Sequence, residues 1–209
     1  MDNNKKPLIG VILGSSAQGR LSEVPAHWIY GLALQRDDLR IELLDMGDAP
    51  LPFYAPATAL PARGMRRWST ALDRVDGFVV IVPERDDDWR PGLTCGLDEA
   101  GAAFAHKPVA FVGYGGGAHA RRIDALRSLA SELQMAPMRG AVHMTISEVM
   151  SVWQMELGFE DHPHLVCAAQ AMLDELSWWA HALRPARTRA PAGAGSGRQR
   201  AAASAISLA

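Results

Sequence analysis

The sequence predicts a doubly wound α/β fold, in which a five-stranded parallel sheet lies between two layers of helices. Five short apolar runs alternate with segments of helical periodicity along the 209 residues. Strands that alternate with helices are joined by right-handed crossovers, which make neighbouring strands parallel. Three of the strand-to-helix loops are rich in glycine or in polar and charged side chains. In such folds the ligand lies at the carboxyl ends of the strands, so these loops form the candidate site.

The strands are indicated by short apolar runs, and the helices by apolar residues spaced three and four apart. Strands are predicted at Pro7–Leu13, at Leu39–Met46, at Gly77–Val82, from Lys107 into the glycine loop that ends at Gly117, and at Met138–Met144. Helices are predicted at Ser22–Arg36, Met65–Asp76, Leu93–Ala105, Ala120–Met135 and Leu165–Arg184. Five strands in this arrangement favour the sheet order 2-1-3-4-5, with the ligand crevice beside the first and third strands.

The chain length suits one domain with a sizeable core. From Pro185 onward the sequence is rich in Ala, Gly, Arg and Pro and has no apolar pattern, so the last helix is expected to end at Arg184. The domain is accordingly predicted to span residues 1–187, followed by a disordered tail at residues 188–209.

Charge and composition exclude several classes of partner. A formal net charge of -2 gives no basis for binding nucleic acid or an anionic membrane surface. No apolar run is long enough to span a bilayer, and the stretch MDNNKKPLIG lacks the apolar core of a secretion signal. Cys95 and Cys167 lie far apart and form no metal-binding or redox motif, which favours free thiols in a reducing cytoplasm.

The first loop, Gly14–Ser22, has the composition of a phosphate-binding loop. Ser15, Ser16 and Ser22 provide hydroxyl groups, Arg20 provides a positive charge, and the following helix provides backbone N–H groups at its start. The loop matches neither the Walker pattern nor the G-x-G-x-x-G pattern. A plain strand-to-helix turn with capping serines is the alternative interpretation.

The second and third loops follow the third and fourth predicted strands. The second, Val82–Gly92, reads VPERDDDWRPG and places three consecutive aspartates beside Arg85. It either binds a ligand or is a solvated loop in which arginine and aspartate side chains pair with one another. The third, Gly113–Ala120, reads GYGGGAHA. Consecutive glycines after a strand indicate either close approach of the backbone to a ligand or a tight turn.

At these loops the chain resembles the NADPH-dependent FMN reductases of the flavodoxin-like superfamily. The resemblance rests on the first loop, on Val82–Glu84, on Leu93 with Leu97 and Asp98, and most specifically on Lys107–Met144. The late segment LDELSWWAHALR also resembles the final helix of that family. The resemblance implies a flavodoxin-like three-layer sandwich that uses FMN and NADPH as cofactors. It also implies hydride transfer from NAD(P)H through FMN to a flavin, quinone or other small acceptor, in a homodimer.

In that family the first loop holds the FMN phosphate, the second holds the ribityl chain and the isoalloxazine, and the third lies along the ring. The matching positions of this chain, which the resemblance implies bind the cofactor, are Ser15, Ser16, Arg20, Ser22, Pro83, Glu84, Arg85, Asp86, Tyr114, Gly115, Gly116 and Gly117. The flavin performs the chemistry, so neither a catalytic acid nor a metal ion is expected.

The chain departs from the family pattern in the first two loops. Ala17 stands where the family's G-S-T-R-P-G-R-x-S pattern has its first arginine, and Arg85 and Asp86 replace the Tyr-Asn of P-E-Y-N. Asp87 and Asp88 follow. Ionised carboxylates only accept hydrogen bonds and repel an anionic reduced flavin. This loop is therefore expected to weaken FMN binding or to make the reduction of FMN harder.

The altered second loop leaves two other functions open. The scaffold could have lost FMN and use the acidic loop Glu84–Asp88, with Arg85 and His119, for non-redox chemistry or ligand binding, because fold does not determine function. A regulatory or partner-binding protein without turnover is the third possibility. The retained first and third loops favour the flavin enzyme.

Other candidates carry less weight. The segment Phe159–His164, FEDHPH, holds two carboxylates and two histidines, but it is expected to be a surface loop because the sequence indicates no third ligand. His119 follows the glycine loop and either acts there as an acid or base or plays no part. His143 is expected to be a hydrogen-bonded core histidine in an apolar strand. Trp178 and Trp179 are expected to provide packing or dimer contacts.

Overall fold

The chain forms a five-stranded parallel sheet of order β2-β1-β3-β4-β5, as the sequence predicts. The computed structural model describes residues 6–13, 21–45, 70–84 and 103–189. The strands are β1 (Leu8–Leu13), β2 (Arg40–Asp45), β3 (Gly77–Pro83), β4 (Pro108–Gly115) and β5 (Ala136–Thr145). Each neighbouring pair is parallel. The strand order changes direction at β1 and β3, which is where doubly wound folds bind their ligands.

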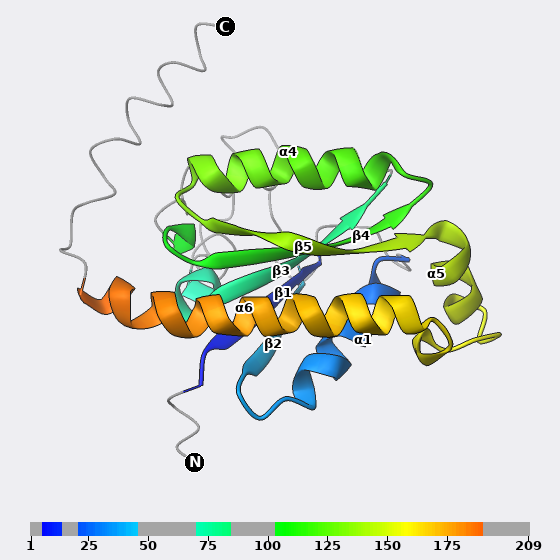
Figure 1. Cartoon of the computed structure of the whole chain (residues 1–209), viewed down its shortest axis with the longest axis horizontal. Coiled ribbons are helices and arrows are strands. Elements are labelled where there is room, and N and C mark those ends of the chain that lie inside the picture. The colour runs from blue at the N-terminus through cyan, green and yellow to red at the C-terminus, as the bar shows by residue number, and fades with distance from the viewer. Residues whose placement is uncertain (1–5, 14–20, 46–69, 85–102, 190–209) are drawn as a thin grey trace, which may run out of the picture.

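Helices cover both faces of the sheet and give the fold three layers. They are α1 (Glu23–Leu34), α4 (Ala118–Glu132), α5 (Ile146–Trp153) and α6 (Pro163–Arg189), with a 3-10 turn η2 (Phe159–Asp161). In Figure 1, α4 lies on one side of the sheet, whereas α1 and α6 lie on the other. Residues 70–74 and 103–104 are also helical, within two further predicted helices. In the part of the chain that the structure describes, no helix is both long enough and apolar enough to cross a membrane.

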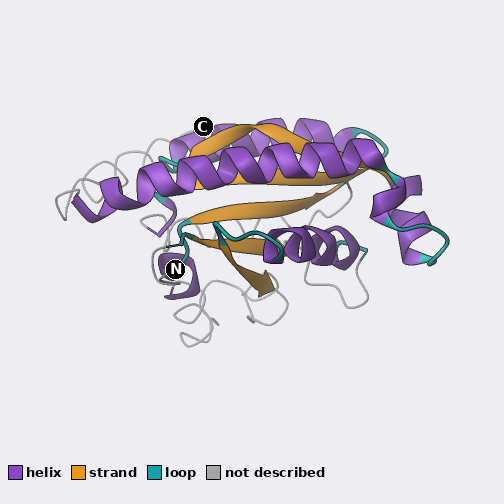
Figure 2. Cartoon of the chain, turned by 60° about the horizontal axis from the view of Figure 1, so that its bottom comes forward, coloured by secondary structure: helices purple, strands orange, loops and turns teal. Residues whose placement is uncertain are grey.

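The central strands are buried on both faces because both faces carry helices, as Figure 2 shows. Every residue of β1, β3 and β4 is buried. Along β1, Val11 packs in the core cluster that includes α1 and α6, whereas Ile12 packs in the cluster that includes α4. Burial on both faces explains why these strands appear in the sequence as unbroken apolar runs rather than as alternating patterns.

The last helix continues beyond its predicted end at Arg184. α6 passes through Pro185 and ends at Arg189. Arg187, in the added turn, donates hydrogen bonds to the buried carboxylate of Asp76 and to the backbone oxygen of His106. These bonds to distant residues stabilise a turn that has no apolar pattern of its own, which is why the sequence does not reveal it. Residues 190–209 lie outside the described chain, so the disordered tail stays a prediction.

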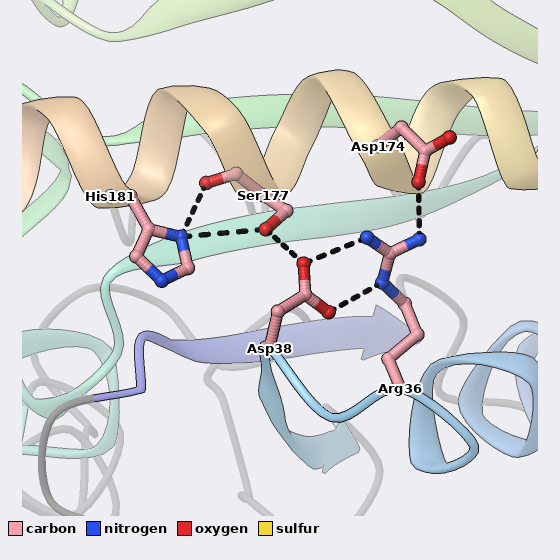
Figure 3. A network of polar contacts seen from close by, with 5 residues as sticks. All are labelled: Arg36, Asp38, Asp174, Ser177 and His181. Carbon is pink, nitrogen blue, oxygen red and sulfur yellow. Dashed lines mark hydrogen bonds and ion pairs between the residues drawn. The ribbon is translucent and has the colours of Figure 1, made fainter.

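A polar network joins the middle of α6 to the turn between α1 and β2 (Figure 3). Arg36 donates two hydrogen bonds to Asp38, at 2.9 and 2.8 Å, and one to Asp174 of α6, at 2.5 Å. Ser177 donates to Asp38 at 2.5 Å, and Nδ1 of His181 lies 2.9 Å from the backbone oxygen of Ser177. Hydrogen bonding to Arg36 lowers the pKa of Asp38 to about 2. Because Asp38 precedes β2, the network lies at the amino edge of the sheet, away from the predicted ligand edge.

α5 and η2 are not among the predicted elements. Oγ1 of Thr145 accepts a hydrogen bond from the N–H of Glu148 at 3.2 Å, and the carboxylate of Glu148 accepts one from the N–H of Thr145 at 2.6 Å. This reciprocal cap has the pattern T-x-x-E, which is a recognisable helix start in the sequence. Phe159 is buried and stacks on Trp28 with 4.5 Å between ring centroids. The segment FEDHPH is therefore anchored to α1 by its first residue rather than being a surface loop throughout.

Candidate functional site

The candidate site lies at the carboxyl edge of the sheet, where β1, β3 and β4 end. β3 and β4 are paired up to Pro83 and Tyr114, so the second and third loops start side by side. The predicted cofactor residues that the structure describes are Ser22, Pro83, Glu84, Tyr114, Gly115, Gly116 and Gly117. Those that lie outside the described residues are Ser15, Ser16, Arg20, Arg85 and Asp86, and Asp87 and Asp88 lie outside them too.

Ser22, at the start of α1, has a hydroxyl group without a hydrogen-bond partner. The residue is fully buried, with 0% of its surface exposed. Its Oγ makes no hydrogen bond in the described structure, and although Ser22 is the N-cap residue, its side chain does not cap the helix. Leaving a buried hydroxyl unbonded costs free energy. Ser22 is therefore a buried donor for which the described residues supply no acceptor.

The start of α1 offers fewer backbone donors to an anion than the sequence implies. The N–H of Val24 already bonds the carbonyl oxygen of Leu21 at 3.2 Å. Pro25, the next residue of the helix, has no N–H. A phosphate at this helix start would therefore depend on side-chain hydroxyls and on nearby positive charge more than on the helix amides.

Glu84, directly after β3, connects the second loop to the third. Its carboxylate accepts hydrogen bonds from the backbone N–H groups of Gly116 and Ala118, the second at 3.1 Å. Arg122 of α4 donates to the carbonyl oxygen of Pro83 at 3.1 Å. The end of β3 is thus bound to the start of α4 by two contacts. A role for Glu84 in non-redox acid–base chemistry would first have to break the bonds that hold the glycine loop.

The glycines of the third loop make room for Glu84. Gly115 has a φ of +142°, a conformation that L side chains rarely adopt, and a Cβ at this position would collide with the Cβ of Glu84. A Cβ on Gly116 would lie 3.1 Å from Oε2 of Glu84. The glycine run is therefore explained in part by close approach of a carboxylate of the same chain, in addition to the turn itself.

Tyr114 places its ring in the core. It is 7% exposed and belongs to the cluster that packs against α1 and α6. The ring therefore contributes to packing at the end of β4, and its contact with a cofactor stays a prediction.

The two histidines near the glycine loop differ in exposure. His143 is exposed, so the prediction of a core histidine is wrong. On β5, Val142 and Met144 are buried on one face, and the alternation of side chains places His143 on the other. His119, in the first turn of α4, is 6% exposed, and its Nδ1 has no hydrogen-bond partner in the described structure. Loss of hydration, complete enough to bury His119 but only partial at His143, lowers the pKa of both imidazoles.

The remaining candidates lie away from this edge or at the surface. No group of three or more His, Cys, Asp or Glu side chains within the described ranges could hold a metal ion. His164 pairs with Glu148 at 2.9 Å, which joins the FEDHPH segment to α5. Trp179 packs against the core, whereas Trp178 is 65% exposed. Cys167 is a free thiol, as predicted.

The structure shows two contacts at this edge that the sequence analysis does not predict. The bond from Arg122 to Pro83 carries no signal in the sequence, because an arginine on an amphipathic helix is ordinarily solvated. The anchoring role of Glu84 does leave a signal. An acidic residue directly after one buried strand can reach the helix start that follows the next strand, and helix starts favour carboxylates.

The described part of this edge fits the positioning of a ligand better than catalysis by side chains. The hydroxyl of Ser22 has no base bonded to it within the described structure, so nothing there activates it as a nucleophile. The carboxylate of Glu84 is bonded to the glycine loop.

Known proteins resemble this chain in sequence. Residues 7–148 match the family model described as NADPH-dependent FMN reductase. The NAD(P)H-dependent FMN reductase ntnL of Nectria sp is 31% identical over 145 residues, which cover 62% of this chain and 71% of that protein. The NAD(P)H-dependent FMN reductase C4B3.06c of Schizosaccharomyces pombe is 27% identical over 137 residues, which cover 62% of this chain and 68% of that protein.

Solved structures share the fold. An oxidoreductase from Corynebacterium diphtheriae aligns with a TM-score of 0.63 at 15% identity, over 84% of this chain and 97% of that chain. The apo form of the NADH:FMN oxidoreductase EMOB aligns with a TM-score of 0.62 at 19% identity, over 80% of this chain and 88% of that chain. At such identities the likeness shows the fold alone. The family model, by contrast, matches most of the chain, from β1 through the glycine loop to α5, and the chain therefore belongs to the NADPH-dependent FMN reductase family of flavodoxin-like oxidoreductases.

Proposed function

We propose that this chain binds FMN at the carboxyl edge of its sheet and transfers hydride from NAD(P)H through the flavin to a small acceptor. Membership of the family supports a flavin, a quinone or a similar molecule as the acceptor. The observation that carries the proposal is the buried, unbonded hydroxyl of Ser22, directly before the helix that follows β1 at the change of strand order. A phosphate oxygen is an acceptor that would complete the hydrogen bonding of this hydroxyl.

The residues of the chain would position the cofactor. When bound, FMN supplies the ring that accepts and passes on the hydride. Ser22 would donate to the phosphate, together with Ser15, Ser16 and Arg20 of the same loop. The glycine loop, which Glu84 holds in place, would lie beside the ring and limit its movement.

Ser22→Ala tests the phosphate contact. A hydrogen bond to a charged acceptor contributes about 1.5–3 kcal/mol, so FMN affinity is expected to fall roughly 10- to 100-fold in a titration followed by absorbance or fluorescence. Ser131→Ala, on the exposed surface of α4, is the matched control and is expected to leave the affinity unchanged. An unaltered affinity in Ser22→Ala would remove this hydroxyl from the site. A wild-type chain that neither contains nor binds FMN would refute the proposal as a whole.

The acidic second loop separates this function from the non-redox alternative. We expect the double substitution Arg85→Tyr, Asp86→Asn to tighten FMN binding or raise the potential of the bound flavin. It leaves the net charge of the loop unchanged, but it supplies an aromatic ring and replaces a carboxylate, which only accepts hydrogen bonds, with an amide that also donates them. Titration and redox potentiometry measure the two effects. Binding of FMN by the double variant alone would favour a scaffold that has lost its cofactor. Weaker binding by the double variant would show that Arg85 and Asp86 belong to a working flavin site.

We also propose a homodimer in a reducing cytoplasm. The family resemblance supports the dimer, and the free thiol of Cys167 is compatible with the compartment. Trp178 on α6 and Leu34 on α1 are 65% and 58% exposed, and exposed large apolar side chains are candidates for an interface. Sedimentation equilibrium is expected to give twice the chain mass and weaker association for Trp178→Ser. A monomeric wild type would contradict this proposal.

A further inference from the structure

The ends of β3 and β5 and the start of α4 bring three ionisable side chains together beside the glycine loop. Glu84 directly follows β3, His119 lies in the first turn of α4, and His143 lies near the end of β5. The ring centroids of the two histidines are 5.5 Å apart. We call Glu84, together with the N–H groups of Gly116 and Ala118 that it binds, the glycine-loop clamp.

His119 is the buried member of this cluster. It is 6% exposed, and its Nδ1 lacks a hydrogen-bond partner among the residues described. A Cβ on Gly113 would lie 2.7 Å from Cδ2 of His119 and 2.8 Å from Cδ1 of Ile123, so the imidazole lies directly against the backbone of β4. A buried ring with an unbonded nitrogen has little to stabilise it when it becomes charged.

The charges around the two rings act in opposite directions. Glu84 favours a proton on His119, whereas His143 opposes it. Around His143, Arg127 opposes a proton and Asp124 favours one. Loss of hydration, which is only partial for His143, is the largest influence on both rings, and it lowers the pKa of each below the ordinary value of 6.5.

We propose that protonation of His119 opens the glycine-loop clamp, so that this edge of the site is held at neutral pH and loosened in mild acid. The clamp binds the N–H of Ala118, the residue before His119, and the His119 ring lies against the backbone of β4 at Gly113. In this proposal the closed clamp holds the ring there, so His119 binds a proton more weakly than in an open state, in which the ring reaches water. As pH falls below the pKa of the exposed ring, proton uptake favours the open state. Glu84 and His119 are positioning residues in this proposal. Their effect on FMN rests on the proposed function, whereas the opening of the clamp does not depend on FMN.

Hydrogen exchange of the Gly116 and Ala118 amides in the intact chain tests the clamp directly. In the wild type, we expect their protection factors to fall between about pH 7.5 and pH 5, by at most about tenfold per pH unit for each proton taken up. His119→Phe and His119→Gln, whose side chains cannot be protonated, are expected to lose most of this fall. His181→Gln, at the amino edge of the sheet, is the matched control and is expected to behave as the wild type does.

Two further variants separate the members of the cluster. Glu84→Gln is expected to lower the protection of both amides throughout the pH range, because the charge-assisted bonds are lost. His143→Gln removes a group that opposes the proton on His119, so the fall is expected to begin at higher pH. Wild-type protection that does not change with pH would overturn the proposal. A fall that persists in both His119 variants would overturn it too.

FMN titrations over the same pH range link the clamp to the cofactor. Affinity is expected to weaken in acid by a larger factor for the wild type than for His119→Phe. Comparing the two cancels the titration of the FMN phosphate itself. A chain that loses amide protection as expected but binds no FMN would refute the proposed function and support the clamp. Identical pH dependence of FMN affinity in both proteins would refute the influence of the clamp on the cofactor.

Discussion

At the scale of single residues, Glu84 and the glycines around it depend on one another. A carboxylate that leaves water needs hydrogen-bond donors, and the start of α4 needs an acceptor for its N–H groups. Gly115 permits the contact, because a Cβ at that position would occupy the space of the Glu84 side chain. The hydrogen bonds of Glu84 thus join two loops that are distant in the sequence.

Gly115→Ala is expected to lower the free energy of unfolding by about 1–3 kcal/mol, because it places a side chain at a positive φ and against Glu84. Gly31→Ala is the matched control. Gly31 lies inside α1, its Cβ would meet nothing within 4 Å, and alanine favours a helix by about 0.5–1 kcal/mol. Urea denaturation measures both variants. Equal changes in the two would contradict the role assigned to Gly115.

At the scale of elements, Lys107 shows how a buried charge joins a strand to a helix. Lys107 directly precedes β4 and is 5% exposed. Its Nζ donates to the carbonyl oxygens of Leu72 and Asp73, at 2.7 and 3.2 Å, near the end of the helical segment 70–74. Burial, followed by the positive charge of Arg187, lowers the pKa of Lys107 from 10.5 to about 8. The ammonium group satisfies helix carbonyls at the cost of its own hydration.

This lowered pKa predicts a pH dependence of stability. Between about pH 8 and 10.5 the unfolded chain retains the proton of Lys107 while the folded chain loses it. The free energy of unfolding is therefore expected to rise with pH in this window, by at most about 1.4 kcal/mol per pH unit, relative to Lys107→Met. Urea denaturation at a series of pH values gives the difference. Parallel pH profiles for the two proteins would show that the pKa of Lys107 is unaltered by folding.

At the scale of the whole molecule, α6 is hydrogen-bonded to the connection between α1 and β2 and to the residue that precedes β3. The helix has 27 residues, a length of about 40 Å. Arg36 bonds Asp174 in its middle, and Arg187 bonds Asp76 just before β3 near its end. Figure 1 shows α6 running along the sheet on the face opposite α4. The helix therefore stabilises parts of the chain that are far apart in sequence.

Two truncations test this role. Removal of Pro191–Ala209 is expected to leave the melting temperature nearly unchanged, because this segment has no periodic apolar face in its sequence. Removal of every residue after Leu183 also deletes Arg184 and Arg187, so the buried carboxylate of Asp76 loses both cations. That truncation is expected to lower the free energy of unfolding by about 3 kcal/mol. Similar melting temperatures for the two truncated chains would contradict the importance of the last turns of α6.

How far the site was predictable differs from residue to residue. The glycine loop and Ser22 are apparent in the sequence because turns and helix starts have strong local residue preferences. The exposure of His143 could also have been predicted from the sequence, since the alternation of Val142, His143 and Met144 places the histidine on the opposite face. The bond from Arg122 to Pro83 could not have been predicted, because it depends on how α4 lies against β3.

The sequence by itself determined the sheet, its order and the edge that carries the site, because burial on both faces leaves unbroken apolar runs and right-handed crossovers allow few topologies. The family also follows from the sequence. Only the tertiary structure decided that Glu84 binds the glycine loop, that His119 is buried, and that α6 continues through Pro185. Each of these depends on contacts between residues far apart in the chain, and local residue preferences carry no information about such contacts.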